Sequence, residues 1–147
     1  MSATSETGHR WPSGATDQRE TSLGAVPIPR IVPYVQSADF EAARSFYVDF
    51  LGLEVSMSMP SFLGIVSPDN PKAQIVVSSA GAEQPMPSFG IDLGSPEAVE
   101  AAHKAAGDEG REVVYPLTDE PWGIRRFFVK DPGGAVVSVL AHLPDAA

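Results

Sequence analysis

The chain has 147 residues, no cysteine and a net charge of −9 at neutral pH. This length predicts one domain, and 43% hydrophobic residues are enough to form a core. The absence of cysteine excludes disulfides and thiolate metal sites, and it favours a cytoplasmic protein. An acidic chain without a basic stripe is a poor partner for nucleic acid, and the longest apolar runs are too short to cross a membrane.

The first 27 residues are expected to form a disordered tail. They are rich in Ser, Thr, Gly and charged residues and show no periodic apolar pattern. They also lack the basic start and the apolar block of a secretory signal. A folded domain is therefore expected over residues 28–143, in two modules at about 28–83 and 86–143.

The first module predicts a strand, a helix and three further strands. The first strand is RIVPYV (30–35), and Ser37 or Asp39 can cap the helix that follows. Gly52 supplies the end of that helix. Further strands are expected over 53–58, 61–67 and 73–79. The apolar residues of the helix recur at helical spacing, at Phe40, Ala43, Phe46, Tyr47 and Phe50.

The same order of elements returns in the second module. A strand over 88–93 leads to a helix that Ser95 and Pro96 begin and Gly107 ends. Three strands follow, at 111–117, 124–131 and 134–140. The two halves align at an offset of 58 at their start and 62 at their last turn, which predicts a four-residue insertion within 118–123. The expected fold is α+β, with two tandem βαβββ modules.

Side chains on a strand alternate between its two faces, so the strands of both modules have an apolar face for the helices and a more polar opposite face. Polar groups gathered on one concave surface suggest a ligand site. The alternative is that they face water on the open side of an antiparallel sheet. The residues of this polar face are Arg30, Tyr34, Ser88, Asp92 and Ser138.

Several motifs resemble the vicinal oxygen chelate superfamily, which includes glyoxalase I, extradiol dioxygenases and bleomycin-resistance proteins. The resemblance rests on Asp39 before the helix, on Phe46-Tyr47 and Leu51-Gly52-Leu53, on Trp122-Gly123-x-Arg125, and on Asp131-Pro132-Gly133-Gly134. It implies that the two modules form a U-shaped, half-open barrel around a concave groove. It also implies a homodimer, since many members are dimers.

The metal enzymes of this superfamily hold a divalent ion with His, Gln or Glu side chains. Carried over by position, those places fall on Arg30, Ser88 and Ser138. Arginine has no lone pair to donate at neutral pH, and a serine hydroxyl is a weak ligand for zinc or iron. The resemblance therefore implies a metal-free member, for which no cofactor is expected.

The resemblance also places Trp122 and Arg125 at the border of the groove. Trp122 offers a flat face for stacking, and Arg125 a planar fork for a carboxylate or carbonyl. Phe127 would share the face of Arg125 and extend the wall. The alternative is a tryptophan that covers the sheet edge beside an Arg125 salt bridge.

These observations favour a small-molecule-binding protein that sequesters a drug or metabolite, as bleomycin-resistance proteins do. The acidic domain favours a neutral or cationic aromatic ligand. One alternative is an enzyme of the lyase, isomerase or dioxygenase type, with Asp92 as the base of a metal-free reaction. Another is a structural or regulatory dimer whose groove is vestigial.

Overall fold

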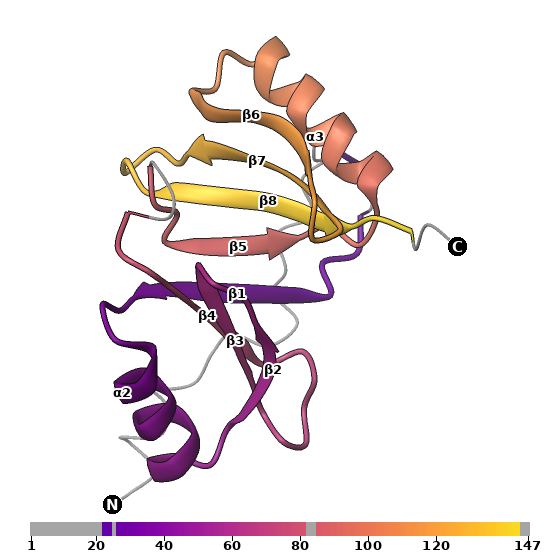
Figure 1. Ribbon diagram of the computed structural model, residues 1–147. Helices are drawn as coiled ribbons and strands as arrows, with labels where there is room; N and C mark the ends of the chain where they lie inside the picture. Colours follow the sequence, from indigo (N-terminus) through magenta and orange to yellow (C-terminus); the bar gives the residue numbers. More distant parts are fainter. Residues whose placement is uncertain (1–21, 25, 82–84, 145–147) are drawn as a thin grey trace, which may run out of the picture.

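A computed structural model describes residues 22–24, 26–81 and 85–144, and both predicted modules are present (Figure 1). The first module contains β1 (Arg30–Gln36), α2 (Phe40–Arg44), the π-helical turn η1 (Ser45–Phe50), β2 (Glu54–Ser58), β3 (Phe62–Val66) and β4 (Gln74–Ser78). The second contains β5 (Phe89–Asp92), α3 (Pro96–Asp108), β6 (Val113–Glu120), β7 (Ile124–Lys130) and β8 (Val136–His142).

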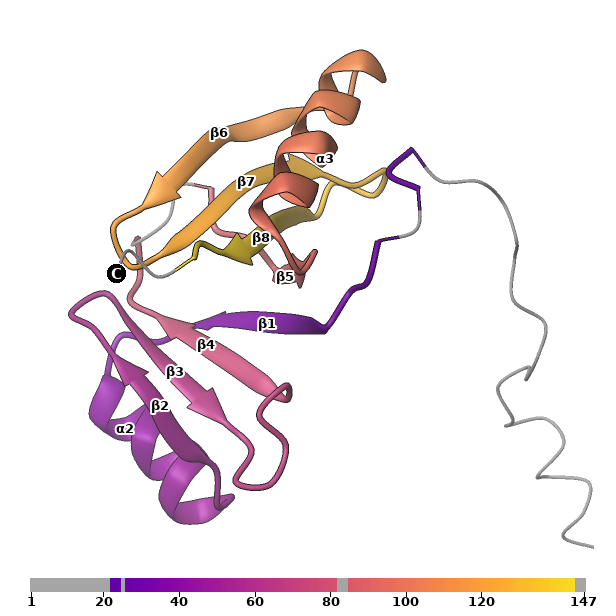
Figure 2. The same cartoon turned by 90° about the vertical axis from the view of Figure 1, so that its right-hand side faces the viewer.

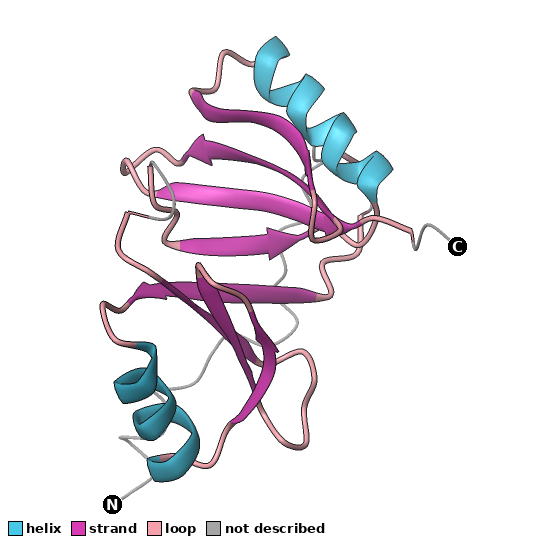
Figure 3. Cartoon of the chain, in the orientation of Figure 1, coloured by secondary structure: helices cyan, strands magenta, loops and turns pink. Residues whose placement is uncertain are grey.

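The strands form one mixed sheet in the order β2-β3-β4-β1-β5-β8-β7-β6, which confirms the α+β prediction. The order reads alike from both ends, because β1 and β5 are equivalent strands of the two modules and meet at the centre. Residues Arg30–Pro33 of β1 pair with β5, and residues Tyr34–Gln36 pair with β4. β1 therefore joins the halves, and the sheet is not closed into a barrel (Figure 3).

The sheet bends at β1 into two arms, and one helix packs against each arm (Figure 2). Under α3, the second module has a core of Leu93, Val99, Ala106, Phe127 and Ala141. The first module has a smaller core of Ala43, Leu63, Ile65 and Val77. Both helices thus cover the apolar faces of their strands and leave the opposite faces to surround the groove.

The first helix begins as predicted, because the side chain of Asp39 accepts a hydrogen bond from the backbone N–H of Ala42. After Arg44 the chain continues as the wider π-helical turn η1. Tyr47 packs on the core, whereas Phe46 and Phe50 are 50% and 72% exposed. The expected apolar face is therefore wrong at these two positions, because a π-helical turn departs from the 3.6-residue period.

The second helix has the predicted cap, since Ser95 accepts from the backbone N–H of Ala98. It does not end at Gly107, which lies inside α3. The left-handed conformation that follows the helix is taken by Gly110, with φ 70°. The predicted insertion within 118–123 consists of the end of β6 and its turn to β7.

Most of the expected tail lies outside the described residues. Its described residues include Leu23 and Val26, and both pack against the core under α3. Ser22 also donates a hydrogen bond to Glu109, just after α3. The domain boundary expected at residue 28 therefore leaves out side chains that belong to the second core. No helix among the described residues is long and apolar enough to span a membrane.

Candidate functional site

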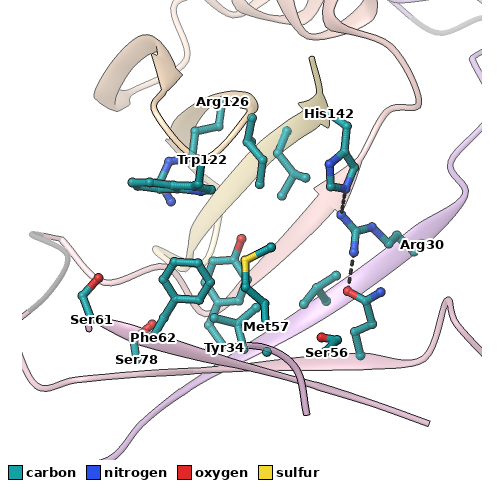
Figure 4. A pocket seen from close by; sticks show the side chains of 16 residues that line it. Arg30, Tyr34, Ser56, Met57, Ser61, Phe62, Ser78, Trp122, Arg126 and His142 are labelled. Atoms are coloured by element: carbon teal, nitrogen blue, oxygen red, sulfur yellow. Dashed lines mark hydrogen bonds between the residues drawn. The ribbon is translucent and has the colours of Figure 1, made fainter. Parts of the chain in front are cut away.

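A cavity of about 330 Å³ lies on the concave side of the sheet, between the two arms. Apolar and aromatic side chains make up much of its wall, and a few polar groups converge on it (Figure 4). The first module supplies Arg30, Val32, Tyr34, Ser56, Met57, Ser61, Phe62, Gly64, Gln74, Val76 and Ser78, and the second supplies Trp122, Ile124, Arg126, Leu140 and His142.

Arg30 forms the polar end of the cavity, where three strands hold its guanidinium group. Its Nε donates to Asp92 Oδ2 on β5 at 2.8 Å, and its Nη1 donates to Gln74 Oε1 on β4. Its Nη2 lies 2.8 Å from Nε2 of His142 on β8. Figure 4 shows Arg30 beside His142 at this end of the cavity. The side chain is only 13% exposed, so its position is fixed before any ligand arrives.

The partners of Arg30 are themselves held in place. Asp92 also accepts from the backbone N–H of Gly94 at 2.8 Å, so each of its oxygens has a donor. The amide nitrogen of Gln74 donates to Pro71 O at 2.7 Å, which turns its oxygen toward Arg30. Because a guanidinium group only donates, a hydrogen bond at this contact requires Nε2 of His142 as the acceptor.

Aromatic rings form the other end of the cavity. The rings of Phe62 and Trp122 have centroids 5.9 Å apart, so the two arms of the sheet meet here. The Arg126 guanidinium lies 5.2 Å from the Trp122 centroid and 4.8 Å from that of Phe128. Its Nε donates to Glu120 Oε2 at 2.7 Å, and both side chains of this ion pair are buried. Arg126 thus combines a buried charge pair with stacking on aromatic faces.

Between these ends, the side chains of Tyr34 and Leu140 lie over β5 and form the floor of the cavity. A Cβ atom at Gly90 would lie 2.8 Å from Tyr34 Oη and 2.7 Å from Leu140 Cδ2, so only glycine allows these side chains to lie across the strand. Ser138 pairs with Gly90 and is 0% exposed. Its hydroxyl has no hydrogen-bond partner among the described residues. Ser138 is therefore part of the floor's interior.

The residues expected on the polar face have different environments. Arg30, Tyr34 and Trp122 line the cavity. Asp92 lies behind Arg30 as its buried partner and does not reach the wall. Ser88 is exposed just before β5 and is not part of the lining, and Ser138 is covered.

The expected orientation of Arg125 and Phe127 is wrong, because both lie on the helix face of β7. Phe127 is 1% exposed in the core under α3. Arg125 binds Asp119 at 2.7 Å and Glu100 of α3 at 3.4 Å. The hydrogen bonds from Arg125 hold the pKa of Asp119 below its usual range. The salt-bridge alternative for Arg125 is the one that the structure shows.

The sequence contained the signal for the correct face of β7. The turn at 131–134 pairs Lys130 with Val136, and hence Phe128 with Ser138 and Arg126 with Leu140. Directly paired residues share a face, so placing Ser138 on the concave side requires Arg126 there and not Arg125.

Other residues of the cavity wall were not among those expected. Gln74 shares a face of β4 with Val76 and Ser78, so alternation could have identified it. His142 continues the alternation of β8 two residues past Leu140, the expected strand end. Nothing in the sequence marked Phe62, which comes from the opposite arm.

The three places carried over from the metal enzymes do not fit a metal ion. Arg30 brings a fixed positive charge, Ser88 lies outside the cavity, and Ser138 offers one covered hydroxyl. Metals of this kind need imidazole, carboxylate or thiolate donors. Among the described residues, no three His, Cys, Asp or Glu side chains form a group that could hold a metal ion.

Known structures with the same fold include several enzymes. The chain aligns with a structure described as an NAD-dependent benzaldehyde dehydrogenase from Legionella pneumophila (TM-score 0.62, 16% identity, covering 76% of this chain and 98% of that one). It also aligns with a glyoxalase/bleomycin resistance protein/dioxygenase superfamily member from Vibrio splendidus 12B01. For this pair the TM-score is 0.59 and the sequence identity 17%, over 76% of this chain and 97% of that one. Homoprotocatechuate 2,3-dioxygenase from Arthrobacter globiformis matches with a TM-score of 0.58 and a sequence identity of 22%, over 85% of this chain and 40% of that one.

At these identities the likeness concerns the fold alone, and no curated protein has a matching sequence. The family model of the Glyoxalase/Bleomycin resistance protein/Dioxygenase superfamily matches residues 28–139, which extend from before β1 into β8 and include most of the cavity wall. The chain therefore belongs to the glyoxalase/bleomycin resistance protein/dioxygenase superfamily.

Proposed function

We propose that the protein binds a small organic molecule in the cavity between its two modules, without a metal ion, and thereby sequesters a drug or metabolite. The observation that carries this proposal is the cavity itself, with aromatic rings at one end and a fixed guanidinium group at the other. Its volume of about 330 Å³ is at the lower limit of ligand pockets. The ligand is therefore compact.

The donor chemistry of the wall supports a metal-independent site. The guanidinium groups of Arg30 and Arg126 both line the cavity, and no aspartate or glutamate is among the described lining residues. Arginine remains protonated throughout the physiological pH range. A divalent cation in this cavity would meet two positive charges and no carboxylate.

The same contacts disfavour the enzymatic alternative based on Asp92. A general base needs an oxygen that can reach a proton of the substrate. Asp92 is 5% exposed, and its two oxygens accept from Arg30 and from the backbone of Gly94. Sequestration needs only affinity, so it makes no such demand.

We also propose that the protein forms a two-fold dimer. The two outer strands, β2 and β6, leave open edges at the ends of the sheet, and such edges are generally covered. Phe46, Phe50 and Leu51 expose a group of apolar side chains at the first helix. A homodimer is the commonest arrangement that covers surfaces of this kind.

A ligand screen on protein dialysed against EDTA tests the proposed function. Hits are identified by thermal shift, and their affinity is then measured by calorimetry with and without added zinc, nickel, manganese or iron. We expect metal-independent hits that Trp122→Ala weakens by about 1–3 kcal/mol, since a buried aromatic anchor dominates a small site. Arg125→Gln, on the opposite face, is the matched control and should leave affinity unchanged. Hits that need a metal, or that bind Trp122→Ala equally well, would contradict the proposal.

A further inference from the structure

We infer that the ligand of this cavity is a planar aromatic molecule with one carboxylate, and that Arg30 binds this carboxylate. The inference deepens the proposed function and rests on it. Among all groups of the cavity wall, Arg30 combines a full positive charge, a fixed position and unused hydrogen-bond donors.

The hydrogen bonds of Arg30 leave part of its guanidinium group available. The group carries five N–H hydrogens, and the described structure uses three of them, toward Asp92, Gln74 and His142. One N–H therefore remains on each terminal nitrogen. Two such donors in a planar fork match the two oxygens of a carboxylate. The atoms that hold Arg30 also preorganise this fork.

The ion pair with Asp92 does not remove the attraction for an anion. Asp92 contacts Arg30 through Nε, and its other oxygen accepts from the backbone of Gly94. The carboxylate lies behind the wall, whereas the guanidinium lines the cavity. A ligand in the cavity therefore meets the positive partner of the pair at shorter range than the negative one.

The charged groups at and behind the wall favour a ligand with a single negative charge. Arg30 and Arg126 are each balanced by one buried acid, Asp92 and Glu120. A dianion such as a phosphate monoester would place two negative charges near Asp92, and the described lining residues include no lysine and no third arginine. An ammonium group would meet guanidinium groups and, among the described lining residues, no aspartate or glutamate. The expectation of a neutral or cationic ligand followed from the net charge of the whole domain, whereas the charged side chains among the described lining residues are arginines.

Arg126 is less suited to this role. Its Nε is bound to the buried Glu120, and its flat face lies against the rings of Tyr115, Trp122 and Phe128 at 4.8–5.3 Å. Only 7% of its side chain is exposed, against 13% for Arg30. Arg126 therefore stabilises the aromatic end, where the ring of the ligand contacts Trp122 and Phe62.

Three matched probes test the inference, namely 2-naphthoate, 2-naphthamide and 2-naphthylmethylammonium. They share one ring system and differ in the charge of one substituent. Calorimetry on the full chain should show that 2-naphthoate binds at least about tenfold more tightly than 2-naphthamide, since a bidentate charged pair adds to the ring contacts. The ammonium compound should bind most weakly.

The variants assign this preference to a residue. In Arg30→Gln/Asp92→Asn, which removes both charges of the pair together, the preference for 2-naphthoate should fall below about twofold while 2-naphthamide binding is retained. Arg125→Gln, an ion-paired arginine outside the cavity, should keep the full preference. Both substituted side chains are largely buried, so the double variant can fail to fold. A second measurement therefore uses the wild-type protein. The Arg30 Nε–H resonance should shift on adding 2-naphthoate and stay in place with 2-naphthamide.

The possible outcomes distinguish a failure of the carboxylate inference from a failure of the proposed ligand-binding function. Equal or tighter binding of the amide or the ammonium compound overturns the carboxylate inference but leaves the cavity as a ligand site. A naphthoate preference that survives in the double variant, or a silent Arg30 resonance, assigns the anion to another group. If none of the three probes binds, both the inference and the aromatic ligand class fail, whereas hits of another class in the wider screen would still support the proposed function.

Discussion

Replacing Ser138 with alanine should stabilise the protein. The hydroxyl is completely buried and has no hydrogen-bond partner among the described residues. On unfolding it would regain its bonds to water, so the folded state bears the desolvation cost of an unsatisfied polar group, about 1–3 kcal/mol. The substitution also removes a few van der Waals contacts, at about 0.1–0.2 kcal/mol each.

The balance of these terms is a gain of about 0.5–2 kcal/mol. For a domain of this size, 1 kcal/mol changes the melting temperature by about 4 °C. Urea unfolding followed by circular dichroism would give the free energy of unfolding for Ser138→Ala and for wild type. Ligand affinity should not change, because Ser138 does not line the cavity.

Ser95→Ala is the matched control, because the same atoms are removed from a serine with a partner. Ser95 caps α3 by accepting from the backbone N–H of Ala98 at 3.2 Å. Its loss should destabilise the protein by about 1 kcal/mol, so the two serines should have effects of opposite sign. If Ser138→Ala instead lowers stability by a similar amount, its hydroxyl has a partner such as an ordered water, and the reasoning is refuted.

Three further predictions concern the rest of the domain. A chain that begins at Pro27 should be about 1–2 kcal/mol less stable than one that begins at Ser22, because it lacks the core contacts of Leu23 and Val26; equal thermal midpoints would contradict this. Light scattering at low micromolar concentration should show a dimer, and a 15.5 kDa species alone would refute the proposed assembly. Arg125→Gln should raise the pKa of Asp119 toward its ordinary value, because hydrogen bonds from Arg125 hold that pKa low; an unchanged carboxyl titration by NMR would show that the pair does not persist in solution.

The sequence by itself determined the local elements and their order. The caps at Asp39 and Ser95 depend on contacts within one turn of a helix, so they could be read from neighbouring residues. The repeated succession of strand, helix and three strands predicted the two modules, and alternation on β1 correctly placed Arg30 and Tyr34 on the cavity side. The exposed Phe46 and Phe50 mark the limit of such reading, because the π-helical turn replaces the regular period.

Only the tertiary structure decided how the cavity is built. Successive residues of a strand point to opposite faces, so an error of one residue in register exchanges the two faces. Arg125 thus lies on the helix side of β7, and its neighbour Arg126 lies at the cavity. Arg30 meets Gln74 and His142, which lie 44 and 112 residues away along the chain. Contacts of this kind depend on how the sheet bends and which strands become neighbours. The net charge of −9 is a sum over the whole chain, whereas the sign of the cavity wall depends on which partner of each ion pair faces inward, and that partner is the arginine.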